Sequence, residues 1–279
     1  MSKIVLLVIA LVVLGGVAAA YWSYRQAVEE TERAVAAIVG RAQTPLGAFQ
    51  PSMVSDLPEV AQRYFNHAIK PGTPLQTTVQ LQMDGKFLLG DRQEYQTYDM
   101  TAYQVLAPPS EFVWVPSMRS GLLRITGSDA LVEGEGWTRF WINSLVPVVN
   151  QGASPDLNRS ALTRAAMEAI WVPASLLPEN GAAWEQTGPN TARVTFSTGV
   201  EPVGITLAVD GKVVEIVSMR WSNENADKVF RLQRFGGAVE AEASFGGYTI
   251  PSRVKMGNHY GTENYLPFFQ VAVTEAQYL

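Results

Sequence analysis

Residues 76–83, with the sequence QTTVQLQM, mark the point where the chain changes from a helical to a strand-like period. Val79, Leu81 and Met83 alternate with glutamines, and Asp84-Gly85 follows as a predicted hairpin turn. Alternation of this kind places the apolar side chains on one face of an extended segment. The segment therefore predicts a β-strand with one face buried.

Further strand candidates continue from this segment to the C-terminus. They are residues 93–106, 111–118, 122–126, 130–133, 138–142, 183–186, 192–198, 204–209, 213–221, 230–235, 238–245, 249–256 and 265–276. The predicted turns between them include Gly127-Ser128-Asp129, Asp210-Gly211, Gly236-Gly237 and Gly246-Gly247. Many short strands separated by turns are typical of a sandwich, a barrel or a strongly curved sheet.

Two helical segments accompany these strands. The first begins at Ser55-Asp56-Leu57-Pro58, with proline near its first turn, and is predicted to run to about Ile69. The second follows Asp156 or Asn158 as its N-cap and ends before Pro173. We therefore predict a mainly β (α+β) fold, a curved and largely antiparallel sheet or half-barrel covered by helices. The largest cavity is expected between sheet and helices.

The N-terminal segment predicts a membrane location. An uncharged run from Ile4 to Ala20 precedes Tyr21, Trp22 and Tyr24. About 17 to 20 apolar residues at 1.5 Å each approach the roughly 30 Å of a bilayer core, and aromatic rings favour its interface. Residues 1–24 are predicted to be a transmembrane anchor. Cleavage after Ala20, as in a signal peptide, is the alternative.

The rest of the chain is predicted to divide into two parts. Residues 25–54 form a helical stalk to about Arg41 and then a linker broken by prolines and glycine, and residues 55–279 form a single β-rich domain. Positive charges close to the apolar run are nearly balanced, and a long C-terminal domain can be exported regardless of its charge. We expect a single-pass protein of the bacterial inner (cell) membrane with an extracytoplasmic domain.

Composition excludes several classes of function. The formal net charge is −5 and no basic cluster is present, which argues against nucleic acid as a partner. The chain has no cysteine, so disulfides and thiolate metal sites are excluded. Its two histidines, His67 and His259, lie in no metal-binding motif, and no G-x-S-x-G elbow is present. We expect no metal site, no cofactor and no catalytic residue.

Candidate ligand-binding residues are one carboxylate, one arginine and several tryptophans. Glu168 and Trp171 are three residues apart, so they share a helix face. A buried Glu168 would need a donor such as Arg119, Arg124 or Arg139. Such a pair either fixes the helix on the sheet or contacts a polar head group at the end of an apolar cavity. The tryptophans either fill the core or line that cavity. The predicted set is Trp114, Arg124, Trp137, Trp141, Glu168 and Trp171.

Several motifs resemble a known family. They include Leu57-Pro58-Glu59-Val60, residues 168–178 (EAIWVPASLLP) and residues 246–253 (GGYTIPSR). Over about residues 57–279 the chain resembles a bacterial family of domains of unknown function (DUF6544/DUF6920-like), which implies no activity. More distantly, it is similar to the periplasmic carriers of lipoproteins and lipids (LolA/LolB/LppX-like). Those proteins are curved antiparallel half-barrels with helices lining an apolar cavity.

These observations favour a non-catalytic, membrane-anchored extracytoplasmic protein. We expect it to bind an apolar ligand, such as a lipid or an acyl chain, between the curved sheet and the helices. One alternative is a structural or protein-interaction domain of the envelope, with an envelope protein as its partner. Another is a hydrolase using Glu133 and Glu135, which flank Gly134 beside two tryptophans.

Overall fold

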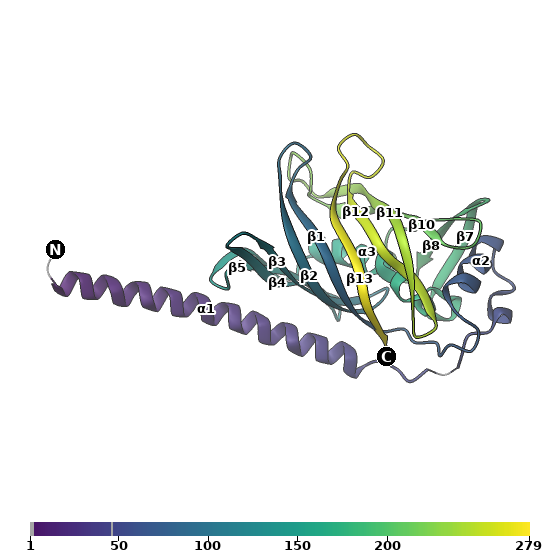
Figure 1. The fold of residues 1–279 in the computed structure, drawn as a ribbon, viewed down its shortest axis with the longest axis horizontal. Coiled ribbons are helices and arrows are strands. Elements are labelled where there is room, and N and C mark those ends of the chain that lie inside the picture. Colours follow the sequence, from purple (N-terminus) through teal and green to yellow (C-terminus); the bar gives the residue numbers. More distant parts are fainter. Residues whose placement is uncertain (1–2, 46) are drawn as a thin grey trace.

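The structure, a computed structural model, describes residues 3–45 and 47–279. Within these ranges thirteen strands form one antiparallel sheet in the order β6-β5-β4-β3-β2-β1-β13-β12-β11-β10-β9-β8-β7. Figure 1 shows this sheet as a strongly curved layer with helices on both of its faces. The predicted mainly β (α+β) fold, with a curved antiparallel sheet covered by helices, is confirmed.

The elements follow one another along the chain with these bounds. The strands are β1 (Val79–Gly90), β2 (Tyr95–Ala107), β3 (Glu111–Ser120), β4 (Leu123–Val132), β5 (Glu135–Ile142), β6 (Val146–Gln151), β7 (Ala182–Gly188), β8 (Thr191–Phe196), β9 (Val203–Leu207), β10 (Val213–Ser222), β11 (Arg231–Phe245), β12 (Tyr248–Asn258) and β13 (Leu266–Tyr278). The helices are α1 (Lys3–Gly40), α2 (Glu59–Ala68) and α3 (Pro155–Met167), with 3₁₀ turns η1 (Pro51–Val54), η2 (Glu168–Trp171), η3 (Pro173–Leu176) and η4 (Pro178–Asn180).

The strand order explains why a helix fills the hollow of the sheet. Strands that follow one another in sequence are neighbours, except β6 and β7, which form the two edges of the sheet. The last strand, β13, pairs with β1 in the middle of the sheet. The chain therefore passes from one edge strand, β6, to the other, β7, through α3 and the 3₁₀ turns. This connection crosses the concave face, where α3 contacts β3, β4, β5 and β10.

Three predicted turns are wrong, because their glycines lie inside strands. Gly85 belongs to β1, Gly127 to β4 and Gly237 to β11. A Cβ at these positions would come within 2.1 Å of a backbone oxygen of the neighbouring strand, and at Gly237 within 1.8 Å. Glycine inside a strand allows such close approach and a tight bend, so these residues belong to the curvature of the sheet. Consequently the predicted strands 122–126 and 130–133 are one strand, as are 230–235 and 238–245.

The predicted N-cap of the second helix is also wrong. The cap of α3 is Ser154, whose side chain accepts a hydrogen bond from the Leu157 amide, and Pro155 occupies the first helical position. Asp156 instead accepts the Trp221 indole N–H at 2.7 Å. Asn158 accepts the backbone N–H of Gly136 at 2.8 Å. Both residues therefore attach α3 to neighbouring strands and do not cap its N-terminus.

Helix α1 has an exposed first half and a packed second half. It runs for 38 residues to Gly40, close to the predicted end. Ile38 is buried with Val105, Val113 and Ala130 in a small core on the convex face of the sheet. The Thr31 hydroxyl is 2.8 Å from the Ser128 hydroxyl in the same interface. The second half of α1 is thus part of the folded body.

Ion pairs extend this contact along the helix. Arg139 pairs with Glu30. Arg41 pairs with Glu111 at 2.8 Å and with Glu133 at 3.1 Å. These pairs are partly exposed, so each contributes less than about 1 kcal/mol, but together they fix the direction of α1 along the sheet.

Candidate functional site

A cavity of about 440 Å³ lies between the concave face of the sheet and α3. Its walls are mainly apolar and come from α3, η2 and strands β1, β3, β4, β5, β6, β10, β11, β12 and β13. Representative wall residues are Phe87, Met118, Ile125, Phe140, Ile216 and Phe268. Small-molecule sites typically measure about 300–1,000 Å³ and are mostly apolar with a few placed polar groups. The cavity has the size and the lining of such a site.

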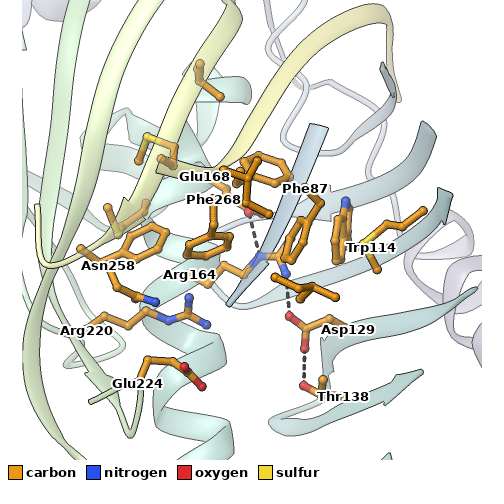
Figure 2. Close-up of a pocket in the computed structure, with 18 of the residues that line it drawn as sticks. Phe87, Trp114, Asp129, Thr138, Arg164, Glu168, Arg220, Glu224, Asn258 and Phe268 are labelled. Atoms are coloured by element: carbon orange, nitrogen blue, oxygen red, sulfur yellow. Dashed lines mark hydrogen bonds and ion pairs between the residues drawn. The ribbon is translucent and has the colours of Figure 1, made fainter. Parts of the chain in front are cut away.

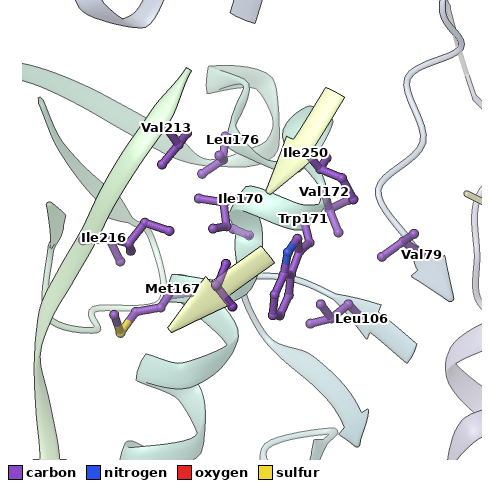
Figure 3. Packing of buried hydrophobic residues seen from close by; sticks show 14 of the residues in the cluster. Val79, Leu106, Met167, Ile170, Trp171, Val172, Leu176, Val213, Ile216 and Ile250 are labelled. Carbon is purple, nitrogen blue, oxygen red and sulfur yellow. The ribbon is translucent and has the colours of Figure 1, made fainter. Parts of the chain in front are cut away.

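The cavity opens at one end of the sheet. Its lining includes Leu89 at the end of β1, Val148 on β6, Glu224 after β10 and Asn258 at the end of β12. Leu89, Val148 and Glu224 are exposed. At the opposite, closed end, Ile170 and Trp171 are buried beside the sheet, as Figure 3 shows. The Trp171 indole donates to the Pro251 carbonyl at 2.9 Å, which fixes this inner wall.

A row of polar side chains crosses the concave face. The strand register places Gln104 opposite Trp114, Trp114 opposite Asp129, and Asp129 opposite Thr138. Residues directly opposite one another in paired strands point to the same face. The Thr138 hydroxyl donates to Asp129 Oδ1 at 2.7 Å. These four residues, far apart in sequence, therefore share one strip of the concave face, and three of them (Trp114, Asp129 and Thr138) line the cavity.

Arg164 of α3 connects these polar side chains into one hydrogen-bonded network. It donates to Asp129 at 2.6 Å and to Glu168 at 2.7 Å, as Figure 2 shows, and Gln104 donates to Glu168 at 2.6 Å. Its guanidinium lies 5.1 Å from the centre of the Trp114 ring. Burial lowers the pKa of Arg164, but the two carboxylates more than offset this and the pKa is raised overall. Arg164 is thus a fully paired, permanently charged group.

Arg220 of β10 is a second cation on the cavity wall, with a different environment. Its Nε–H donates to the Ser160 hydroxyl at 3.1 Å, and its guanidinium lies 5.3 Å from the Phe235 ring. Among the residues that the structure describes, no carboxylate forms an ion pair with it. Burial lowers its pKa and the positive charge of Arg164 lowers it further, and the carboxylates of Asp129, Glu168 and Glu224 offset this only in part. Its terminal nitrogens are therefore free for a negatively charged group.

The six predicted ligand-binding residues separate into two sets. Trp114, Glu168 and Trp171 line the cavity. Trp137 and Trp141 lie on the opposite face of β5, where Trp141 meets Tyr24 of α1 with ring centres 5.6 Å apart. Neighbouring residues of a strand point to opposite faces of the sheet. Thr138 and Phe140 line the cavity, so Trp137 and Trp141 of the same strand point away from it.

Arg124 lies outside the cavity. It is exposed at the start of β4, and its Nε–H donates to the Ser117 hydroxyl at 3.1 Å. The predicted donors for Glu168, which were Arg119, Arg124 and Arg139, are wrong. The donors are Gln104 of β2 and Arg164, which lies four residues before Glu168 near the end of α3. Its i, i+4 spacing from Glu168 is a signal that sequence alone contains.

Asp129 and Arg220 had no such signal. Asp129 lies in a segment whose sequence predicts a turn, and Arg220 is a charged residue in an ordinary strand pattern. Their position at the cavity depends on the strand register and on α3 crossing the sheet.

The carboxylates proposed for hydrolysis do not lie at this cavity. Glu133 and Glu135 are in the β4–β5 turn region, and Glu133 is paired with Arg41. Neither is among the residues that line the cavity between the sheet and α3. His67 is held elsewhere, with its Nε2 2.7 Å from Glu242.

Residues 47–271 match the model of a family of unknown function, DUF6544. The chain belongs to this family. The resemblance to DUF6544 seen over about residues 57–279 is therefore confirmed. No curated protein matches the sequence of this DUF6544 member.

A LolA superfamily protein from Nitrosomonas europaea is similar with a TM-score of 0.45 and 9 % identity, covering 79 % of this chain and 92 % of that one. A DUF1329 family protein from Desulfovibrio piger is similar with a TM-score of 0.40 and 9 % identity, covering 79 % and 90 %.

Proposed function

We propose that this protein is a membrane-anchored binding protein for an amphipathic, negatively charged lipid or acyl chain. The observation that carries the proposal is the apolar cavity of about 440 Å³ with Arg220 on its wall. The acyl part would replace water against the apolar wall, and each buried methylene contributes about 0.8 kcal/mol. The acidic head would pair with Arg220, the cation that lacks an acidic partner among the described residues.

The position of Arg220 supports this orientation of the ligand. Arg220 is two residues from the end of β10, beside the turns at the open end of the cavity. Figure 2 shows Glu224 and Asn258 on the same side of the cavity. Ile170 and Trp171 at the closed end are apolar and buried. A ligand with its head near the opening and its chain inside fits this distribution.

The anchor is the first half of α1. Its 18-residue window reaches a mean hydropathy of 2.8, and it is the one helix in the described part of the chain that is long and apolar enough to cross a membrane. Exposed aromatic residues, Tyr21 and Trp22, follow the apolar run, as at a membrane interface. We propose the bacterial inner membrane as the location, with the β-rich body outside the cytoplasm. The second half of α1 would belong to that body together with residues 55–279.

The test compares two ligands that differ only in charge. Full-length protein in nanodiscs is titrated with a fluorescent long-chain fatty acid and with its methyl ester. Arg220→Gln is expected to weaken binding of the acid about tenfold or more, because a hydrogen bond to a charged group contributes about 1.5–3 kcal/mol. Binding of the ester should not change.

Arg193→Gln is the matched control, since Arg193 lies on β8 in an exposed pair with Glu185. It should bind both ligands as the parent does. Failure of either ligand to bind the parent, or equal binding of the acid by the parent and Arg220→Gln, would contradict the proposal. Native mass spectrometry of the purified protein shows directly whether a lipid is retained.

A further inference from the structure

The hairpin between β3 and β4 combines exposed leucines with unpaired arginines. Its turn carries Leu122, which is 96 % exposed, and Leu123, which is 46 % exposed. Arg119 and Arg124 lie directly behind these leucines and are paired with each other in the strand register. Two like charges directly opposite each other are unfavourable unless an anion compensates them. The register also places Asp99 of β2 opposite Arg119. Among the described residues, however, neither arginine forms an ion pair, and one carboxylate balances at most one of the two charges.

The neighbouring hairpin between β5 and β6 adds to this surface. Val146 is 58 % exposed and Val148 is 50 % exposed. Because successive strands are antiparallel neighbours, the β3–β4 and β5–β6 turns lie at the same end of the sheet. The open end of the cavity is at this end too, since Leu89 and Val148 line it. Exposed apolar side chains thus gather where the cavity opens.

Helix α1 leaves the sheet at this same end. Thr31 contacts Ser128, and Arg41 contacts Glu133, so α1 and β4 run in the same direction. Following the helix back towards its N-terminus therefore leads towards the β3–β4 turn. Figure 1 shows the N-terminal half of α1 continuing past the tips of β3, β4 and β5.

The β3–β4 hairpin lies beside the end of the apolar run of α1. Leu123 is about five residues, or ~16 Å, before Ser128 on β4, and this distance corresponds to about 11 residues of helix. Counting back from Thr31, the partner of Ser128, places Leu123 at about the level of Ala20. Ala20 is also the first described side chain of α1 that is not exposed. Tyr21 and Trp22, the aromatic residues at the end of the apolar run, follow immediately.

We propose that the β3–β4 hairpin is a second membrane contact, in which Leu122 and Leu123 enter the bilayer surface beside α1. Arg119 and Arg124 bind the negatively charged head groups, which supply the negative charge that Asp99 alone does not provide. Each arginine near an anionic surface contributes attraction that falls off within a Debye length. The cavity then opens towards the bilayer, so that a lipid passes between them without crossing bulk water. This inference rests on the proposed anchoring by α1.

The chain has no cysteine, so a single introduced cysteine can be labelled specifically. Full-length Leu122→Cys, Val209→Cys and Ala10→Cys are each labelled with an environment-sensitive fluorophore in vesicles of phosphatidylcholine and phosphatidylglycerol. Val209 is the matched control, because it is 80 % exposed but lies in the β9–β10 turn at the opposite end of the sheet. We expect bromolipids to quench the label at positions 122 and 10, and aqueous iodide to quench it at position 209.

The outcomes separate the two proposals. Lipid quenching at position 10 with iodide quenching at position 122 would leave the anchor standing and overturn the second contact. Absence of lipid quenching at both positions would overturn both. Protection of position 122 from iodide without lipid quenching would indicate a protein, such as a second copy, on the hairpin, and would also overturn the contact.

A charge variant tests the role of the arginines. The double variant Arg119→Gln, Arg124→Gln should lower the membrane–water partition ratio of the label at position 122. We expect a decrease of about fivefold for each arginine removed, in vesicles containing phosphatidylglycerol. In pure phosphatidylcholine the shift should disappear. Arg193→Gln is the control and should have no effect. An equal effect in both kinds of vesicle would overturn the head-group contact.

Discussion

Arg164 and Arg220 lie on the same cavity wall, but among the described residues only Arg164 forms ion pairs with carboxylates. Arg164 holds two carboxylates, and the three side chains are 13–17 % exposed. Removing one member of such a buried group leaves charges without partners, which costs more than the group contributes when it is complete. Arg164 is therefore best described as a structural residue that fixes α3 on the sheet. Arg220 remains as the charge available to a ligand.

Arg164→Met is expected to lower the free energy of unfolding by about 3–5 kcal/mol, because Asp129 and Glu168 then remain buried without a cation. Arg193→Met is the matched control; its exposed pair with Glu185 contributes about 0–1 kcal/mol. Chemical denaturation of full-length protein in detergent, followed by tryptophan fluorescence, measures both. A similar loss for the two variants would show that the Arg164 network does not stabilise the fold.

At the scale of elements, α1 combines two roles along one continuous helix. Its buried stripe contains Ala27, Thr31 and Ile38, spaced at one or two helical turns. This stripe packs on the convex face, whereas the apolar side chains that the structure describes before Ala20 are exposed all round. A membrane-spanning part that continues directly into a packed part would hold the sheet in one orientation relative to the bilayer.

Ile38→Asp is expected to release the second half of α1 from the sheet, because an unpaired carboxylate would replace a side chain that is 1 % exposed. Trypsin should then cleave at Arg33 at least tenfold faster than in the parent. Ala36→Asp introduces the same charge on the exposed face of the same turn and should be cleaved like the parent. Equal cleavage of both variants would mean that Ile38 does not hold the helix.

At the scale of the whole molecule, the cavity is a consequence of topology. The chain must connect the two edge strands, and it does so by laying α3 and its following turns across the concave face. This connection fills the hollow at Ile170 and Trp171 but leaves space towards the opposite end. Natural interiors are close-packed, so a space of this size needs an occupant or a role.

Met256→Trp is expected to fill the cavity, because Met256 lines it and is only half-buried. Lipid retention in native mass spectra should be lost, while the free energy of unfolding changes by less than about 1 kcal/mol. Met83→Trp makes the same exchange in the packed core, where Met83 is 1 % exposed, and should cost about 1–3 kcal/mol or more. Unchanged lipid retention in Met256→Trp would place the ligand elsewhere.

The sequence by itself determined the long apolar helix, the two shorter helices and nearly all of the strands. These features depend on local periodicity, which residues such as Val79, Leu81 and Met83 display directly. It also selected Glu168 and Trp171 together, because their spacing places them on one helical face.

Only the tertiary structure decided which glycines turn the chain and which bend a strand, since a Cβ at Gly127 is excluded by the neighbouring strand and not by its own sequence. It likewise decided that Trp114 faces the cavity whereas Trp141 faces α1, because strand register and the crossing of α3 are long-range properties. The pairing of Asp129 with Arg164, and the lack of any such partner for Arg220 among the described residues, follow from the same long-range placement.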